Sequence, residues 1–270
     1  MLSYDVNLSI LFTELPLLRR PAAARAAGFD AVELWWPFDH PVPGDRETGA
    51  LLRALDDAGV RLVGLNFDAG DMAAGDRGLA SRPDDSARFR ANIDAAVGIA
   101  EATGCRVLNA LYGNRVPGLD AAVQEELAVA NLARAAEAAL RAGATVVVEA
   151  LNPAENPDYP VVSSEAALHV VHRVREEAGA GNVALLADLY HLARAGEDPL
   201  GVIARHAHRF GHVQIADAPG RGAPGTGAIP YDTVLPALET SGYAGHVGLE
   251  YRPAGPSADG FGWLGAKETT

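Results

Sequence analysis

A regular alternation of two kinds of segment constrains the fold of this chain more than any other feature of its sequence. Short, mostly apolar runs that favour β-structure are separated by longer, alanine-rich stretches with helical patterning. Most of the short runs are continuously apolar, which is typical of parallel strands covered on both faces. They predict strands at Val6–Ile10, Ala31–Leu34, Arg61–Asn66, Arg106–Ala110, Thr145–Glu149, Val183–Asp188, Gly211–Ala216 and His246–Glu250.

The stretches between these runs predict helices. Several of them stop at a glycine shortly before the next strand, as at Gly28 and Gly59. Glycine commonly ends a helix because the position after the last turn favours a left-handed backbone. The predicted helices are Leu17–Ala27, Arg46–Ala58, Asp84–Thr103, Asp120–Ala142, Ser164–Ala178, Pro199–His206 and Tyr231–Ser241.

Eight β units in a chain of 270 residues match the closed (β/α)8 TIM barrel in number and size. The alternative, an open doubly wound sheet, normally carries a glycine-rich fingerprint after its first strand, and this chain has none there. We therefore expect a single α/β domain, with the barrel over residues 1–253 and a tail over residues 254–270. Phe261 and Trp263 make that tail apolar enough to dock on the barrel or on a second subunit.

Charge and residue usage exclude several functional classes. The chain has 22 Lys+Arg against 35 Asp+Glu, a formal net charge of -13, so nucleic acid and anionic membranes are unfavourable partners. Cys105 is the only cysteine, which excludes disulfide frameworks and thiolate zinc sites. The only lysine, Lys267, lies in the polar tail, which argues against Schiff-base chemistry. Without a membrane-length apolar run or a basic leader, we expect a cytoplasmic protein that binds a small molecule, with homo-oligomerisation left open.

Polar residues stand at the carboxyl ends of the predicted strands. In a TIM barrel the active site collects at that end, whereas the amino-end face mainly serves stability. A carboxylate that ends a buried apolar run also needs a partner, because burying a bare charge is strongly unfavourable. The strand-end residues, in chain order, are Glu33, Asn66, Asn109, Glu149, Asp188, Gln214 and Glu250.

The last four of these residues predict a metal site. They come from consecutive strands and would bring three carboxylates and an amide oxygen to one place. Such oxygen donors suit Mg²⁺ or Mn²⁺ better than Zn²⁺. The alternative interpretation is that each residue bonds loop amides or forms salt bridges at the barrel rim. The predicted ligands are Glu149, Asp188, Gln214 and Glu250.

Residues next to these strand ends are candidates for substrate binding. His191 lies on the loop predicted after the sixth strand, and Arg221 lies in a glycine-rich loop after the seventh, where this fold often binds anions. An arginine there can clamp a carboxylate through two hydrogen bonds, although a rim salt bridge is the alternative. Asn66 ends the third strand. Trp35, Trp36 and Phe38 follow the second and can wall the pocket or pack beneath a loop, and Trp36 is the one assigned to substrate binding.

The remaining histidines and the cysteine are not predicted to be functional. His206, His208 and His212 resemble a metal cluster, but they precede or begin the seventh strand and so belong to the opposite face. His246 opens the eighth strand at that same face. Cys105 precedes its strand, and we expect it to be a small buried apolar residue.

Six segments of the chain form a recognisable set of motifs: Asn66-Phe-Asp-Ala-Gly-Asp71, Ala73-Ala-Gly-Asp-Arg-Gly78, Asp188-Leu-Tyr-His191, Gln214-Ile-Ala-Asp-Ala-Pro-Gly-Arg221, Pro224-Gly-Thr-Gly227 and Gly248-Leu-Glu-Tyr-Arg-Pro253. Together they resemble the hydroxypyruvate isomerase family of xylose isomerase-like barrels. The resemblance runs from about Asn7 to Pro253. It implies a divalent metal held by Glu149, Asp188, Gln214 and Glu250, the same set as the strand ends indicate.

The chain departs from the family pattern at two places. Ala228 stands after the Pro-Gly-Thr-Gly turn, where an acidic residue is expected, and Ala150-Leu151-Asn152 replaces Pro-Ile-Asn after the fifth strand. The first change removes a charge from the rim of the site and a potential partner of Arg221. It bears on the identity of the substrate more than on the metal.

The resemblance implies conversion of hydroxypyruvate to tartronate semialdehyde by proton transfer through an enediolate. Glu149 and Glu250 would move the proton, His191 would bond a substrate oxygen, and Arg221 would hold the carboxylate. The alternatives are a 2-oxo-tetronate isomerase or ketose 3-epimerase of the same barrel type, a metal-free glycosidase, an endonuclease of the same superfamily, and a binding protein without activity.

Overall fold

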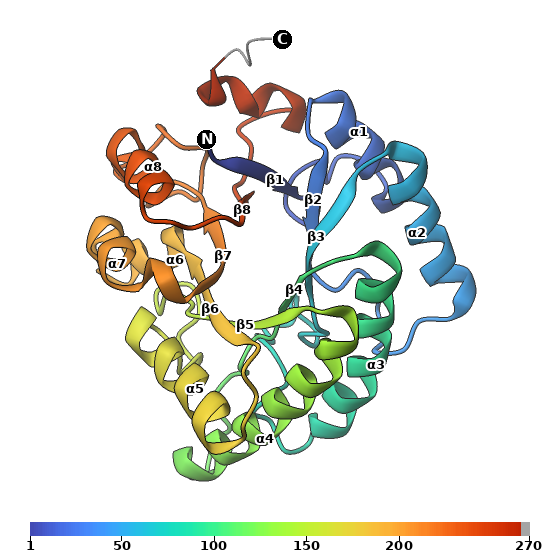
Figure 1. Ribbon diagram of the computed structural model, residues 1–270, viewed down its shortest axis with the longest axis vertical. Coiled ribbons are helices and arrows are strands. Elements are labelled where there is room, and N and C mark those ends of the chain that lie inside the picture. Colours follow the sequence, from blue (N-terminus) through green and yellow to red (C-terminus); the bar gives the residue numbers. More distant parts are fainter. Residues whose placement is uncertain (266–270) are drawn as a thin grey trace.

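The computed structural model describes residues 1–265, and in this part of the chain eight parallel strands close into a barrel in chain order (Figure 1). Each strand pairs with the next, and β8 pairs with β1 through partners such as Tyr4 and Val247. The predicted TIM barrel is confirmed. The strands are β1 (Ser3–Asn7), β2 (Ala31–Leu34), β3 (Arg61–Asn66), β4 (Val107–Asn109), β5 (Thr145–Glu149), β6 (Val183–Asp188), β7 (Phe210–Ile215) and β8 (His246–Leu249).

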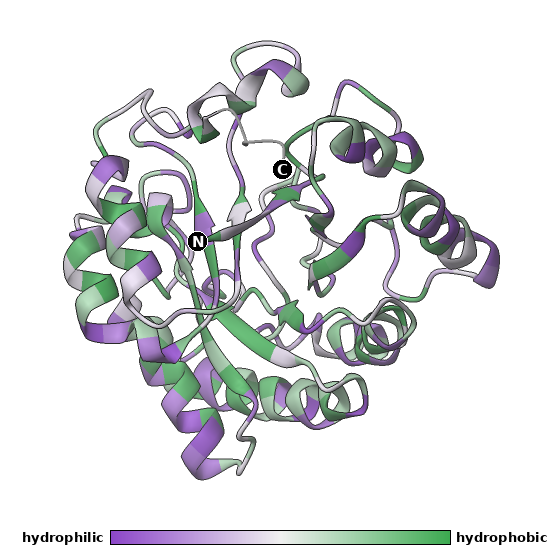
Figure 2. Cartoon of the chain, turned by 45° about the horizontal axis from the view of Figure 1, so that its top comes forward, coloured by the Kyte–Doolittle hydropathy of each residue, from purple (hydrophilic) through white to green (hydrophobic). Residues whose placement is uncertain are grey.

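Helices surround the barrel and cover its outer face (Figure 1). Hydrophilic residues of the helices lie mostly toward the outside of the molecule, and hydrophobic residues lie mostly toward the strands (Figure 2). Local signals fix several ends: Ser163 Oγ accepts from the Ala166 amide at the start of α5, and Gly59 ends α2 with φ 64°. The helices are α1 (Arg20–Ala26), α2 (Asp45–Ala58), α3 (Ser86–Thr103), α4 (Ala121–Ala139), α5 (Ser164–Glu177), α6 (Leu189–Arg194), α7 (Pro199–His206) and α8 (Tyr231–Thr240).

The first strand is three residues out of place in the sequence prediction. The structure ends β1 at Asn7 and not at Ile10, because the chain turns there: the Leu11 amide donates to the Asn7 carbonyl at 2.9 Å. The Asn7 side chain supports the turn by accepting from the Ser9 amide at 2.9 Å. The apolar residues after Asn7 therefore belong to a buried loop, and Asn7 lies at the carboxyl end of the barrel.

The segment after β8 packs against the barrel where β8 meets β1. It forms a 3-10 helix, Ser257–Leu264, whose Phe261 ring lies 4.7 Å from the ring of Phe29 between centroids. Ser257 Oγ accepts from the Phe12 amide at 2.6 Å. The described part of the predicted tail thus docks on the barrel. Lys267 lies outside the described residues.

Candidate active site

Four residues predicted from the strand ends meet at one end of the barrel. Asp188 is paired in register with Gln214, and Gln214 is paired with Gly248 of the next strand. Glu149 ends β5, and Glu250 follows β8 directly. All four polar side chains are buried, with residue exposures of 5% or less. The strand ends therefore concentrate three carboxylates in a region from which water is largely excluded.

A cavity of about 670 Å³ lies over this cluster. Glu149 and Glu250 line it, whereas Asp188 and Gln214 are covered and do not. Its walls come from loops that follow several different strands, as expected for an active site of this fold. The other polar or charged residues of the lining include Asn66, Arg77, Glu155, His191, Arg221 and Arg252.

Oxygen atoms in the cluster are left without hydrogen-bond partners. Asp188 Oδ2 and Gln214 Oε1 are buried and accept no hydrogen bond among the described residues. Glu149 and Asp188 each place a carboxylate oxygen within 4.8 Å of the other and of a His191 ring nitrogen. Buried acceptors without donors are costly unless something else satisfies them. The donor set therefore fits a divalent cation with oxygen ligands.

Glu149 and Glu250 carry the most perturbed electrostatics of the site. Burial, followed by the neighbouring Glu250 and Asp188 carboxylates, raises the pKa of Glu149 well above its usual range, although Asn109 Nδ2 donates to its Oε2 at 2.8 Å. Burial also raises the pKa of Glu250 to about 7, against the opposing effect of Arg221. Groups with pKa values near neutrality are suited to taking and returning protons.

Arg221 lies against the carboxylates. Its Nη2 bonds Glu250 Oε2 and lies 3.7 Å from Asp188 Oδ2. Its guanidinium carbon also lies 5.3 Å from the centre of the Tyr190 ring, a cation–π distance. Arg221 adopts φ 55°, in the left-handed region that non-glycine residues rarely occupy. The strained turn thus brings a cation to the rim of the carboxylate cluster.

His191 lies on a short helix and not on the predicted loop. Helix α6 begins directly after β6 because Asp188 Oδ1 accepts from the Tyr190 and His191 amides. Burial lowers the pKa of His191 to about 4, so its ring is neutral at pH 7. The Asn152 amide donates to Nδ1 at 3.1 Å, which leaves the ring proton on Nε2, 3.7 Å from Asp188 Oδ2. His191 can therefore donate a hydrogen bond toward the cavity.

Of the aromatic residues that follow β2, Trp35 forms the wall of the cavity and Trp36 does not. Trp35 lines the cavity, and its Nε1 donates to Glu250 Oε1 at 2.6 Å. Trp36 instead lines an adjoining hollow, where it packs on Phe38 at 5.2 Å between ring centroids. The periodicity of a strand could not decide between two adjacent tryptophans, because both follow the end of β2. Asn66, by contrast, lies in the cavity wall.

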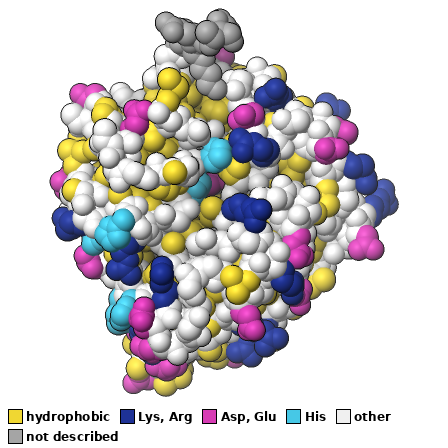
Figure 3. Space-filling view, in the orientation of Figure 1, with side chains coloured by type: hydrophobic (Ala, Val, Ile, Leu, Met, Phe, Trp, Pro, Cys, Tyr) yellow, Lys and Arg dark blue, Asp and Glu magenta, His cyan; other side chains and the backbone are white. Residues whose placement is uncertain are grey.

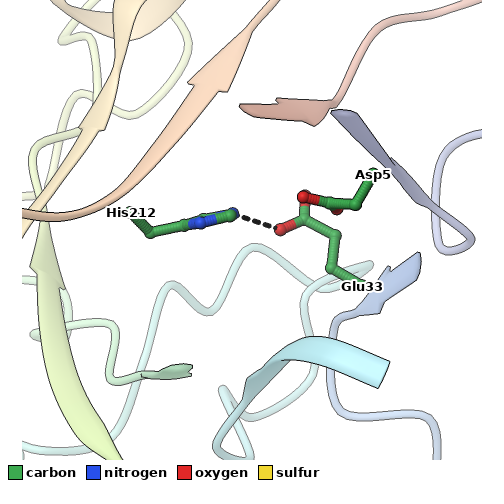
Figure 4. A group of neighbouring side chains, drawn as sticks. All are labelled: Asp5, Glu33 and His212. Carbon is green, nitrogen blue, oxygen red and sulfur yellow. Dashed lines mark hydrogen bonds and ion pairs between the residues drawn. The ribbon is translucent and has the colours of Figure 1, made fainter. Parts of the chain in front are cut away.

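Two predictions about individual residues need correction. His212 was assigned to the opposite face, but it lies inside the barrel with its Nε2 2.7 Å from Glu33 Oε2 (Figure 4). The rule that places a strand's first residues at the amino-end rim fails here, since His212 is the third residue of β7 and points inward. Glu33 likewise points into the barrel interior and does not line the cavity.

Arg77 is a cavity residue that the sequence reasoning did not assign. It follows β3 in a loop, and three neutral acceptors hold its guanidinium: Asn156 Oδ1 at 2.6 Å and the carbonyls of Met72 and Asp76 at 3.0 and 2.6 Å. No carboxylate forms a salt bridge with it among the described residues. Nothing but the segment Ala73–Gly78 marked it in the sequence.

Ala228 lies away from the chemistry. It is exposed, and it does not line the cavity. Its amide donates to the Ala218 carbonyl at 2.7 Å, which holds the turn together without a charged side chain. Arg221 already has Glu250 as its partner. The missing acidic residue therefore leaves the carboxylate cluster as it is.

The outer surface is of mixed charge. On the face shown in Figure 3, acidic and basic side chains lie next to one another and the basic ones do not form a continuous patch. In the described part of the chain, the helices are too short or too polar to cross a bilayer.

Comparisons with known proteins agree with this geometry. A family model described as xylose isomerase-like TIM barrel matches residues 21–267. A Streptomyces coelicolor protein with a provisional hydroxypyruvate isomerase name is 59% identical, covering 97% of this chain and 95% of its own. The hydroxypyruvate isomerase of Escherichia coli is 32% identical, covering 98% of both chains. Other relatives carry the name 2-oxo-tetronate isomerase, at 32% and 35% identity.

A solved structure shows the same fold. A Brucella melitensis crystal structure described as AP endonuclease, family 2, superposes with a TM-score of 0.88 at 37% identity, and 98% of each chain is covered. Fold and site thus define a xylose isomerase-like barrel with a carboxylate-rich active site. The chain belongs to the hydroxypyruvate isomerase family of these barrels, and it is an isomerase.

Proposed function

We propose that this isomerase is metal-dependent and converts hydroxypyruvate to tartronate semialdehyde. The observation that carries the proposal is the buried cluster of Glu149, Asp188 and Glu250, in which oxygen atoms of Asp188 and Gln214 have no donor. The similarity to proteins named hydroxypyruvate isomerase supports the choice of substrate. The cavity over the cluster has room for a small sugar acid.

The residues present fit a divalent metal. Glu149, Asp188, Gln214 and Glu250 would hold Mg²⁺ or Mn²⁺, since all four offer hard oxygen donors. When bound, the metal supplies Lewis-acid polarisation of a substrate carbonyl and hydroxyl, an effect of several kcal/mol. Its charge would also offset the mutual repulsion of the three carboxylates. Arg221 supplies one further compensating positive charge beside Asp188 and Glu250.

Glu149 and Glu250 are the proposed acid–base groups. One carboxylate takes a proton from C3 of hydroxypyruvate, and the resulting enediolate accepts a proton at C2. A hydroxyl proton moves from O3 to O2, so that the carbonyl shifts from C2 to C3 with no net gain or loss of atoms or electrons. Both glutamates line the cavity, so either carboxylate can exchange a proton with a substrate bound there.

The cavity walls supply the groups that would orient the substrate. We assign the Nε2 proton of His191 to a substrate oxygen, because His191 is neutral and its Nδ1 already accepts a hydrogen bond. Asn66, the last residue of β3, offers a further amide in the cavity wall. Arg221 and Arg77 are the proposed partners of the substrate carboxylate. Arg77 has the free charge, since its three partners are neutral.

Arg77→Gln is expected to raise the KM for hydroxypyruvate by about 10- to 100-fold, because a hydrogen bond to a charged group contributes about 1.5–3 kcal/mol. The turnover number should change much less, since Arg77 does not contact Glu149 or Glu250. Steady-state kinetics with Arg115→Gln, a change at an exposed loop arginine, provide the matched control. An unchanged KM would show that Arg77 does not bind the substrate carboxylate.

The reaction is tested by incubating the metal-supplemented enzyme with hydroxypyruvate in deuterated water and following the product by NMR. We expect tartronate semialdehyde carrying solvent deuterium at C2. Deuterium exchange in a ketose without movement of its carbonyl would indicate a 3-epimerase instead. Ligand binding without any exchange would indicate a binding protein, and glycoside cleavage that survives chelation would indicate a glycosidase.

A 2-oxo-tetronate isomerase is the second candidate. Relatives with this name are as similar to the chain as the Escherichia coli hydroxypyruvate isomerase. A cavity of about 670 Å³ also leaves space beyond a three-carbon acid. The same proton transfer would serve both substrates, so the ratio of their kcat/KM values in a common assay decides between them.

A further inference from the structure

An inner layer of polar side chains lies inside the barrel, next to the buried cluster of Glu149, Asp188 and Glu250. Glu33 of β2 and His212 of β7 face each other there, and Asp5 of β1 lies beside them (Figure 4). All three residues are buried, with exposures of 3% or less. None of them lines the cavity. Any influence of this layer on the active site must therefore pass through other side chains.

Glu33 connects the inner layer to the active site through three hydrogen bonds. His212 Nε2 lies 2.7 Å from Glu33 Oε2, and Gln214 Nε2 donates to Glu33 Oε1 at 2.8 Å. Asn7 Nδ2 donates to the same Oε1 at 3.0 Å, and it also donates to Glu250 Oε1 at 3.0 Å. Glu33 thus contacts one predicted metal ligand directly and a second through Asn7.

The barrel wall leaves room for the Glu33 carboxylate at two glycines. A Cβ added at Gly248 would lie 2.7 Å from Glu33 Oε1, and one added at Gly64 would lie 3.2 Å from Glu33 Oε2. Both glycines have ordinary backbone angles, so the need is for space and not for an unusual conformation. The neighbouring strands are therefore built around this side chain.

The chemistry of Glu33 determines which way the Gln214 amide faces. A carboxylate oxygen accepts hydrogen bonds, so Gln214 must turn its NH₂ group toward Glu33. Its carbonyl oxygen then faces the other way, and it is one of the buried oxygens without a donor. A flipped amide would place oxygen against oxygen at Glu33 and present a donor to the metal side.

We propose that Glu33 is a positioning residue, which fixes the amide of Gln214 with its oxygen toward the metal cluster and, through Asn7, orients Glu250. This orientation of Gln214 and Glu250 raises the affinity of the site for Mg²⁺ or Mn²⁺, as is typical of residues that orient metal ligands. The inference rests on the metal dependence proposed above. It assigns to Glu33 a function in metal binding, although Glu33 does not line the cavity.

The test compares matched carboxylate-to-amide changes in the same layer. Glu33→Gln is expected to weaken Mn²⁺ binding about tenfold, because its uncharged amide oxygen is a weaker acceptor for Gln214 and Asn7 and its NH₂ group replaces the oxygen that faces His212. Glu33→Leu, which leaves no acceptor, is expected to weaken it about 100-fold. Asp5→Asn is the control. Burial, followed by the Glu33 carboxylate, raises the pKa of Asp5 well above its usual range. Neither Asp5 carboxylate oxygen has a hydrogen-bond partner among the described residues. Asp5 has no hydrogen bond to Gln214 or Asn7. The Mn²⁺ affinity of the Asp5→Asn protein should therefore stay within about twofold of wild type.

Mn²⁺ affinity is measured by isothermal titration calorimetry and by electron paramagnetic resonance, and folding is checked by circular dichroism and melting temperature. A purely structural Glu33 would lower the melting temperature and leave the Mn²⁺ affinity of the folded protein unchanged, which would overturn the inference. If Glu33→Leu fails to fold, Glu33→Gln decides. Wild-type protein that isomerises without binding Mn²⁺ or Mg²⁺ would overturn both the inference and the metal dependence.

Discussion

Replacing Glu250 with Gln is expected to lower the turnover of hydroxypyruvate by about 10²- to 10⁴-fold, the usual contribution of a positioned acid–base group. Gln has nearly the same shape and can still accept from Asn7 and Trp35, which now bond Glu250 Oε1. It cannot take up a proton from carbon. Single-turnover kinetics and deuterium exchange into the substrate measure the loss at the chemical step.

The control for this variant is Glu176→Gln, the same chemical change at an exposed position of α5. It should retain wild-type turnover. Mn²⁺ titration of Glu250→Gln keeps the result interpretable, because Glu250 is also a proposed metal ligand. Full turnover in a Glu250→Gln protein that binds Mn²⁺ would show that another group moves the proton.

Removal of divalent metal by exhaustive chelation is expected to reduce proton exchange by about 10³-fold, which corresponds to about 4 kcal/mol of lost Lewis-acid stabilisation. Without a cation, the buried carboxylates of Glu149, Asp188 and Glu250 repel one another with Arg221 as their nearby positive charge. The melting temperature should therefore also rise when Mn²⁺ is restored at about 100 times its Kd, by about 5–10 °C for a stabilisation of about 2.7 kcal/mol.

Elemental analysis of the chelated protein is needed beside these two measurements. Activity restored by Mg²⁺ or Mn²⁺ but not by the chelator's own counter-ion supports a direct role of the metal. Undiminished exchange in protein with far less than one metal per chain would contradict the metal dependence, while leaving an acid–base role of Glu149 and Glu250 to be tested by mutation.

Most of the fold could be predicted from the sequence, because buried parallel strands and glycine-ended helices leave strong local signals. The start of the barrel was harder. The run after Asn7 is as apolar as a strand, and the turn that ends β1 depends on a side-chain bond from Asn7 that no periodicity reveals. Helix α6 was missed for a similar reason: it spans only Leu189–Arg194 and starts on the cap provided by Asp188.

The candidate site was predictable where residues end a strand, since the barrel brings those positions together. Residues whose placement depends on loops were not predictable in the same way. Arg77 is held in the cavity wall because Asn156, from a loop far along the chain, accepts a hydrogen bond from its Nε. The place of His212 near the start of its strand also gave the wrong position, because the side chain of this third residue of β7 points into the barrel interior, where it meets Glu33.

The seam between β1 and β8 joins the first strand of the chain to the last, with Ser3 opposite His246 and Val6 opposite Leu249. During synthesis on the ribosome the amino-terminal strand emerges long before its partner, so one of its edges stays unpaired until nearly the whole polypeptide has been made. The final contacts of Phe261 with Phe12 and Phe29 come later still. A premature stop within α8, before β8 is made, would therefore release a chain with an exposed edge strand and uncovered aromatic rings, a combination that favours aggregation.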